Sequence, residues 1–447
     1  MQLINKMSKI RDKNATGNIA LLLAAASVNL ISPSTQAKEN PWQVDSSLLV
    51  YSESDSRVSA VEPIVALRKD LGDEHIFSMK MTLDTLTGAS PNGALASKQT
   101  QTFTGPSGEK TYTAAAGETP LDSSFKDTRG ALNLNWEQPI SANNRISVGG
   151  NFSKEYDFTS LGLNAALAHD FNNKNTTLSF GVGYEADQIN PVGSTPVEFS
   201  PIARTEEDDD DVKKEKRGNE SKNVLDLLLG VTQVINRHWL TQLNYSYGTS
   251  NGYHSDPYKV LSVLDDQGNL IVHPFGNIDN WYVYESRPDS RIRSSLYWAN
   301  KIHLTEDVID FSYRYYTDDW GIDSHTLDLR YRYEFAGNMY LEPHARWYKQ
   351  SAADFYQLYI AQSTQTSGSN INLDYASADP RLAELTGMTF GLKYGIELSK
   401  SSEFNIRVEQ YTQKYKVNSS DLPALSGLDL APDMKAMTIS FGYTFEF

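Results

Sequence analysis

The chain of 447 residues contains no cysteine. An exported protein without cysteine has no disulfides to stabilise it and no thiolates for a metal site. Beyond the N-terminal segment there is no run of about 18 apolar residues, which excludes a membrane-spanning helix. The net charge is −16 and no long basic run occurs, so the chain offers no positive surface for nucleic acid. None of these absences excludes a membrane that is crossed by strands.

The first 37 residues have the composition of a secretory signal. A positive region is followed by an apolar stretch over 19–31, and Ala37 ends a small-residue cleavage pattern. The positive region holds Lys6, Lys9, Arg11 and Lys13. An amphipathic anchor or a cytosolic helix is the alternative, but the apolar stretch is short for a bilayer. We predict a signal peptide over 1–37 and one domain over 38–447.

Alternation of apolar and polar residues is the dominant pattern in the rest of the chain. The terminal stretch KAMTISFGYTFEF, 435–447, places apolar side chains on its odd positions and small or polar ones between them. This period of two is typical of strands with one face in an apolar medium. Sixteen such stretches occur, at 43–52, 57–69, 75–87, 129–138, 144–155, 160–171, 175–187, 222–235, 238–249, 290–303, 307–317, 324–335, 339–350, 387–399, 402–415 and 435–447.

The connections between these stretches alternate between short and long. From the second stretch on, every other link is short, as in LGDE, NNK, NRH, LTED and AGN. The long links include 88–128, 188–221, 250–289, 351–386 and 416–434. Outer-membrane barrels have short periplasmic turns and long external loops. The sequence therefore predicts an all-β fold, a single transmembrane antiparallel barrel of about 16 strands, in the outer membrane of a Gram-negative bacterium.

The last strand carries two further predictions. Its odd residues from Met437 to Phe447 are expected to face lipid. Phe447 resembles the C-terminal aromatic signature that the barrel-assembly machinery reads, which makes that machinery an expected partner. We expect this strand to close the barrel against 43–52. The register there is the least clear, because Leu48, Leu49 and Val50 are consecutive apolar residues.

Charged residues gather on the polar faces of the strands between 290 and 415. Two explanations stay open: a wall that selects a polar solute, or a ladder of salt bridges that stiffens the interior. The predicted wall consists of Arg291, Arg293, Lys301, Asp310, Arg314, Asp328, Arg330, Arg332, Glu334, Glu342, Arg346, Lys393, Glu397, Arg407 and Glu409.

Little in the sequence indicates catalysis or a bound cofactor. The acidic run at 206–217 lacks the glycine and spaced ligands of a calcium loop, so we interpret it as a solvated external loop. His254 and His325 each lie close to Ser and Asp, but proximity in sequence is weak evidence for a hydrolase. No GxSxG, HExxH, zinc, haem or phosphate motif appears. We predict no enzymatic activity, no metal and no cofactor.

Several dense polar segments resemble a bacterial family of outer-membrane proteins known only as a domain of unknown function. They include LDTLTGASPNGA (83–94), GYHSDPYKVLSVLD (252–265), SYRYYTDDWGIDSHT (312–326) and SADPRL (377–382). The resemblance covers nearly all of the chain after residue 37 and implies an exported barrel without an assigned activity. It also implies genomic neighbours that include a flavin transferase and a small lipoprotein, which suggests a periplasmic or lipoprotein partner and extracytoplasmic redox work.

These segments fall at predicted external strand ends, where small polar residues, Asp and Trp suit loops that fold on one another. We therefore expect an ordered vestibule that narrows the barrel. Its expected residues are Asp84, Thr85, Ser90, Asp157, Ser160, His254, Asp256, Lys259, Asp318, Asp319, Trp320, His325, Asp354, Asp379 and Arg381.

A barrel of this size is wide enough for an aqueous channel. The leading functional hypothesis is a porin-like channel for a small polar or charged solute. The alternative is a non-conducting scaffold that binds a partner protein, and a hydrolase at the rim is a third hypothesis. The sequence does not identify the solute.

Overall fold

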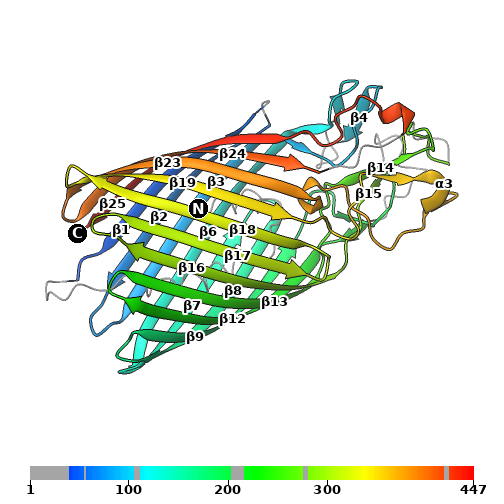
Figure 1. Ribbon diagram of the computed structural model, residues 1–447. Coiled ribbons are helices and arrows are strands. Elements are labelled where there is room, and N and C mark those ends of the chain that lie inside the picture. The colour runs from blue at the N-terminus through cyan, green and yellow to red at the C-terminus, as the bar shows by residue number, and fades with distance from the viewer. Residues whose placement is uncertain (1–39, 55–56, 105–110, 203–215, 275–279, 417–421) are drawn as a thin grey trace.

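The computed structural model describes residues 40–54, 57–104, 111–202, 216–274, 280–416 and 422–447. Sixteen long antiparallel strands close into one barrel (Figure 1). In ring order they are β1 (Gln43–Glu53), β2 (Val58–Asp70), β3 (Ile76–Pro91), β6 (Leu121–Ser141), β7 (Asn144–Lys154), β8 (Phe158–Phe171), β9 (Thr176–Ile189), β12 (Glu220–Asn236), β13 (Trp239–Gly252), β16 (Ser290–His303), β17 (Val308–Asp318), β18 (Asp323–Phe335), β19 (Met339–Gln350), β23 (Leu385–Ser399), β24 (Ser402–Tyr415) and β25 (Met434–Glu446).

The two faces of the barrel wall differ in chemistry, as the alternation predicts. Outward positions carry large apolar side chains that stay exposed, which is the surface that a barrel presents to lipid. They include Val50, Met81, Leu134, Phe180, Leu229, Leu243, Leu296, Leu329, Phe390 and Phe441. Inward positions carry charged, polar and small residues, so the barrel is a transmembrane barrel with a polar interior.

The seam between the first and last strands resolves the uncertain register. β1 pairs with β25 from Gln43 opposite Glu446 to Glu53 opposite Ala436. Leu48 and Val50 are exposed on the outward face, whereas Leu49 is buried on the inward face. Backbone hydrogen bonds join Trp42 and Phe447 in both directions, at 2.9 and 3.0 Å. Closure therefore continues to the last residue and leaves no strand edge unpaired in the membrane.

All sixteen predicted strands are confirmed, and β6 and β3 extend furthest beyond their predicted bounds. β6 begins at Leu121 instead of 129, and β3 continues to Pro91. These extensions pair with each other, with Ser90 opposite Asp122. They lie at the end of the barrel with the long loops, where no lipid requires strict alternation. Within the described residues, no helix is long and apolar enough to cross a membrane.

Inward-facing glycines let neighbouring side chains lie flat against the wall. A Cβ atom at Gly395 would lie 2.2 Å from the Tyr340 ring, and one at Gly248 would lie 2.3 Å from Oδ1 of Asp226. Both distances are impossible for a real side chain. The Tyr340 ring and the Asp226 carboxylate therefore occupy the space beside these glycines.

Gly395→Val is expected to destabilise the barrel by about 1–3 kcal/mol, because the new side chain displaces the Tyr340 ring. The Arg332 guanidinium lies 3.7 Å from the centre of that ring and would shift with it. Urea unfolding in vesicles measures the effect. Gly130→Val is the matched control, since nothing lies within 4 Å of a Cβ atom there. Equal midpoints for the two variants would contradict the packing role.

The two ends of the barrel are built differently, as Figure 1 shows. One end, the turn end, has short turns and the C-terminus. The other, the loop end, carries small sheets made from the long connections. Their elements are β4 (Gln101–Thr104), β5 (Thr111–Ala114), β10 (Thr195–Pro196), β11 (Lys216–Gly218), β14 (Val260–Leu264), β15 (Tyr282–Tyr284), β20 (Tyr359–Ala361), α3 (Gln362–Gln365), β21 (Thr366–Ser367), β22 (Asn370–Ile371), η3 (Pro380–Leu382) and η4 (Pro423–Leu425).

Candidate functional site

The loops at the loop end form a packed cap around the three-stranded sheet β15-β14-β20. We define the cap as residues 253–274, 280–288 and 351–384 with the described segments packed on them. β14 lies between β15, which is antiparallel to it, and β20, which is parallel and comes from a different loop. The sheet buries a core of Leu261, Val263, Trp281, Val283 and Ile360, none more than 1% exposed. Burial of this apolar core holds two long loops together.

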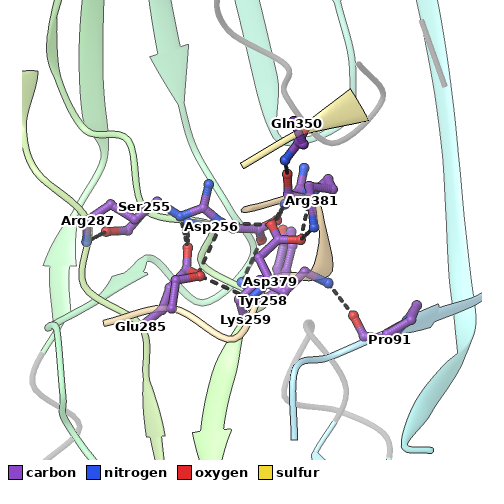
Figure 2. A network of polar contacts seen from close by, with 11 residues as sticks. Pro91, Ser255, Asp256, Tyr258, Lys259, Glu285, Arg287, Gln350, Asp379 and Arg381 are labelled. Carbon is purple, nitrogen blue, oxygen red and sulfur yellow. Dashed lines mark hydrogen bonds and ion pairs between the residues drawn. The ribbon is translucent and has the colours of Figure 1, made fainter. Parts of the chain in front are cut away.

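A network of buried charges lies within the cap and reaches the ends of the barrel strands (Figure 2). The Arg287 guanidinium lies 2.6 Å from Oε1 of Glu285 and 2.8 Å from Oδ2 of Asp379. Arg381 donates to Asp256 at 2.9 Å and also pairs with Asp379. Glu285 and Arg287 were not among the sequence candidates, because nothing in their local pattern separates them from other loop residues.

The contacts of this network cross the mouth of the barrel. The Tyr258 hydroxyl donates to Asp157, which directly precedes β8, at 2.6 Å. On the other side, Gln350 at the end of β19 donates to the Arg381 carbonyl at 2.9 Å. β8 is sixth and β19 thirteenth in the ring of sixteen, so the two anchors lie seven strands apart. Asp256 joins them, because it accepts from both the Tyr258 amide and Arg381.

The anchors at β8 and β19 are not the only ones. Lys259 donates to the carbonyl of Pro91 at the end of β3. Trp320, in the β17–β18 turn, is buried and donates to the Ser290 carbonyl at 2.9 Å. The Arg291 guanidinium lies 4.3 Å from the centre of its ring. The cap is thus fixed to strands on several sides of the barrel.

Charge pairing outweighs burial at two carboxylates of the cap, whereas burial raises the pKa of the neighbouring Glu285. Burial raises the pKa of Asp379, but the charges of Arg381, Arg287 and Lys259 outweigh it and hold this pKa well below its usual range. Asp256 behaves alike: burial raises its pKa, Lys259 and Arg381 lower it, and the net direction is down. Burial lowers the pKa of His254 to about 3, so its imidazole is neutral at physiological pH.

Acid is expected to loosen the cap before it unfolds the barrel. Carboxylates with depressed folded pKa values stabilise the cap above their unfolded pKa of about 4, and this contribution is lost as the pH falls further. His254 adds a loss that begins near its unfolded pKa of about 6.5. Near-ultraviolet circular dichroism between pH 7 and 3 reports on buried Trp281. In His254→Asn the loss between pH 6.5 and 4.5 should diminish; a signal constant to pH 3 would contradict the assignment.

The strand register places all fifteen predicted wall residues on the inward face. Most of them pair with a neighbour. Arg407 lies 2.8 Å from Glu342 and 3.2 Å from Glu409. Arg332 lies 3.1 Å from Glu334 and 3.7 Å from Glu397. Other pairs are Arg291 with Asp318, Arg293 with Asp226, Lys301 with Asp310, Arg330 with Asp328 and Lys393 with Glu403.

His344 lies at the centre of this wall, and the sequence reasoning missed it. Its Nδ1 is 2.8 Å from Oε1 of Glu409, and its Nε2 is 3.1 Å from Oδ2 of Asp328. The imidazole therefore joins carboxylates of β18 and β24 across two intervening strands, β19 and β23. Its position between Glu342 and Arg346 in the alternation would have placed it inward.

The predicted vestibule residues divide into three groups. Asp157, Asp256, Lys259, Asp379 and Arg381 belong to the cap network. His254, Asp318, Trp320 and Asp354 gather where the cap meets the β17–β18 turn: the His254 ring lies 5.6 Å from that of Trp320, and the Asp354 amide donates to the Trp320 carbonyl at 2.9 Å. Asp84 and Ser160 lie elsewhere on the barrel: Asp84 pairs with Arg129, and Ser160 is buried on the inward face. Asp319 lies in the β17–β18 turn beside Trp320 and accepts from the Ile292 amide.

Two of the predicted vestibule residues lie on the opposite face. Thr85 pairs with outward Val61, so it cannot line the interior. His325 lies between Tyr315 and Lys349 in the register and contacts the Tyr313 hydroxyl at 2.8 Å. Alternation continues past the apolar belt and turns both side chains outward. For Ser90 only the backbone pairing is described.

His254 does not contact the serine that follows it in the sequence, as the hypothesis of a rim hydrolase would suggest. His254 contacts Ser250 through Nε2 at 2.8 Å, and its Nδ1 faces the Gly252 carbonyl at 2.8 Å. Ser255 instead accepts from the Arg287 amide. Among the described residues, no group of three His, Asp or Glu side chains is placed to hold a metal. The signal segment 1–37 lies outside the described residues, as does the acidic run except for Lys216 and Arg217.

A family model described as "Protein of unknown function (DUF3570)" matches residues 15–445. The chain belongs to this family. No curated protein matches it. The barrel is similar to the CymD monoaromatic hydrocarbon channel, at 8% identity and a TM-score of 0.40, over 97% of this chain and 94% of that one.

Two further solved barrels are similar at the same level. OprB from Pseudomonas putida is 10% identical with a TM-score of 0.42, over 91% of this chain and 94% of that one. OccK2 from Pseudomonas aeruginosa, solved with glucuronate, is 9% identical with a TM-score of 0.39, over 92% and 98%. At this level of identity the likenesses concern the barrel fold alone.

Proposed function

We propose that the protein is a gated outer-membrane channel for a small polar or charged solute. The observation that carries this proposal is the cap network that crosses the mouth between β8 and β19 above a charged inner wall. A solute moving between the loop end and the interior meets this crossing. Its contacts are polar and charge-assisted, so they can open and re-form without exposing the apolar core of the cap sheet.

The inner wall suits passage of a solute rather than a sealed interior. Inward glycines let Tyr340 and the Asp226–Arg293 pair lie along the wall instead of across the barrel. Rings of charge on a wet wall select solutes in pores. The ladder of ion pairs also stiffens the wall, so both explanations of the charged strands hold together in this proposal.

A reversible disulfide across the cap tests the proposed gate. The Ala424 amide donates to the Gln267 carbonyl at 2.9 Å, which joins the tip of the β14 loop to the loop between β24 and β25. Because the two main chains are in direct contact, Gln267→Cys with Ala424→Cys is the pair chosen for the bridge. The chain has no other cysteine, so the chemistry is unambiguous.

In planar bilayers, oxidation of the double-cysteine variant is expected to lower the fraction of time for which the channel is open at least tenfold. Reductant should restore it. Gln267→Cys alone is the control and should not respond to reductant. Equal conductance in both redox states would contradict the gate. Absence of conductance in the wild type and in the reduced variant would contradict the channel, and a co-purifying second protein would then favour the scaffold.

A further inference from the structure

Arg314 is an inward-facing cation with no carboxylate partner among the described residues. It lies on β17, four residues from the strand's loop end, and its guanidinium is 5.1 Å from the centre of the Tyr297 ring. Among the described residues it makes no ion pair and no hydrogen bond. Most other cations of the wall lie beside a carboxylate. A guanidinium has five donors in a rigid fork, so leaving all of them unused needs a physical explanation.

Two more guanidinium groups converge on the same part of the wall. Arg314 lies opposite Thr326 and Arg346 opposite Asp328, so they approach β18 from its two sides. Arg330 follows two residues after Asp328 on β18 itself. Its Nε is 3.7 Å from Oδ1 of Asp328, and its Nη2 is buried without a hydrogen-bond partner.

The two carboxylates beside Arg330, Asp328 and Asp310, are shared with other groups. Asp328 also contacts His344 at 3.1 Å, and Asp310, which lies opposite Arg330, is 3.6 Å from Lys301. Like charges on neighbouring positions of a sheet repel, which destabilises the folded barrel unless an anion or water compensates. The Thr389 hydroxyl, opposite Arg346, is buried without a partner and offers one more donor.

We propose that Arg314, Arg330 and Arg346 form a binding site for a small anion that carries a carboxylate or phosphate group. Arginine forks match the two oxygens of such groups and bind them with charge-assisted hydrogen bonds. The Tyr297 ring bounds the site on the β16 side. This inference rests on the proposed channel function and specifies its solute class, since the site lies on the inner wall towards the capped end.

Equilibrium dialysis of the detergent-solubilised protein tests the site without requiring conductance. Radiolabelled inorganic phosphate and succinate are used in separate arms, which distinguishes a phosphate from a carboxylate ligand. Wild type should bind at least one of them saturably. Arg314→Gln should weaken that binding at least tenfold, and Arg314→Lys, which keeps the charge without the fork, should lie between the two.

Lys393→Gln is the matched control, because it removes a positive charge from the same wall where Glu403 already pairs with it. The affinity of this control for the anion should stay within about twofold of wild type, a change of much less than the 1.4 kcal/mol that corresponds to about tenfold. Equal affinities of wild type and Arg314→Gln, or no saturable binding of either anion, would overturn the site. Conductance without anion binding would support the channel and overturn the site. Anion binding without conductance would support the site and overturn the channel.

Discussion

Replacing Arg287 by alanine is expected to open the cap. Its side chain is 4% exposed and lies between Glu285 and Asp379. Removing one partner from a buried ion pair leaves uncompensated charge and costs about 3–5 kcal/mol. Because every 1.4 kcal/mol is about tenfold, the open cap should become more than a hundredfold more populated.

Proteinase K cleavage of the folded protein within 250–290 and 351–386 measures this opening, since cleavage follows the open population when reclosing is fast. Lys416→Ala is the control. It removes a surface pair with Glu384, in which Lys416 is 70% exposed, and such pairs contribute about 1 kcal/mol or less. Equal cleavage rates in the two variants would show that the buried network does not hold the cap.

Leu296→Arg is expected to hinder insertion of the barrel. Leu296 lies near the middle of β16 on the outward face and is 42% exposed. A charge at the bilayer midplane of a barrel costs about 2–4 kcal/mol. Urea unfolding from vesicles measures this cost directly.

Ala299→Arg is the matched control, because Ala299 lies on the same strand but faces inward. It should lose less than about 1 kcal/mol, since an interior position can hydrate the new charge or pair it with a carboxylate. A larger loss at Ala299 than at Leu296 would reverse the assignment of the two faces.

The barrel was predictable because lipid imposes a strict rule on each strand. Every outward residue in the membrane must be apolar and every backbone group must be paired, so alternation and loop length together determine strand number and topology. The seam at Leu48, Leu49 and Val50 needed the structure, because three consecutive apolar residues fit either face. Pairing with β25 decides it, and Leu49 is buried inside.

The cap was predictable only as a location. The loops have no periodicity that would reveal β14 and β20 as parallel neighbours from different links. Grouping residues by closeness in sequence also placed Thr85 and His325 in the vestibule, although alternation turns both outward. His344 shows the reverse error. A lone histidine carries no motif, but its even position puts it on the same face of the strand as Glu342 and Arg346.

Ion selectivity of the purified wild-type protein in planar bilayers shows whether the barrel is an anion-selective channel. We expect stepwise conductance. In a salt gradient the reversal potential should lie towards the equilibrium potential of the anion, because Arg314 has no carboxylate partner among the described residues and favours anions on the inner wall. Arg314→Gln should move the reversal potential towards zero, and Lys393→Gln should move it less. A wild-type protein that conducts at no voltage, with its barrel shown to be folded and inserted, would rule out the channel.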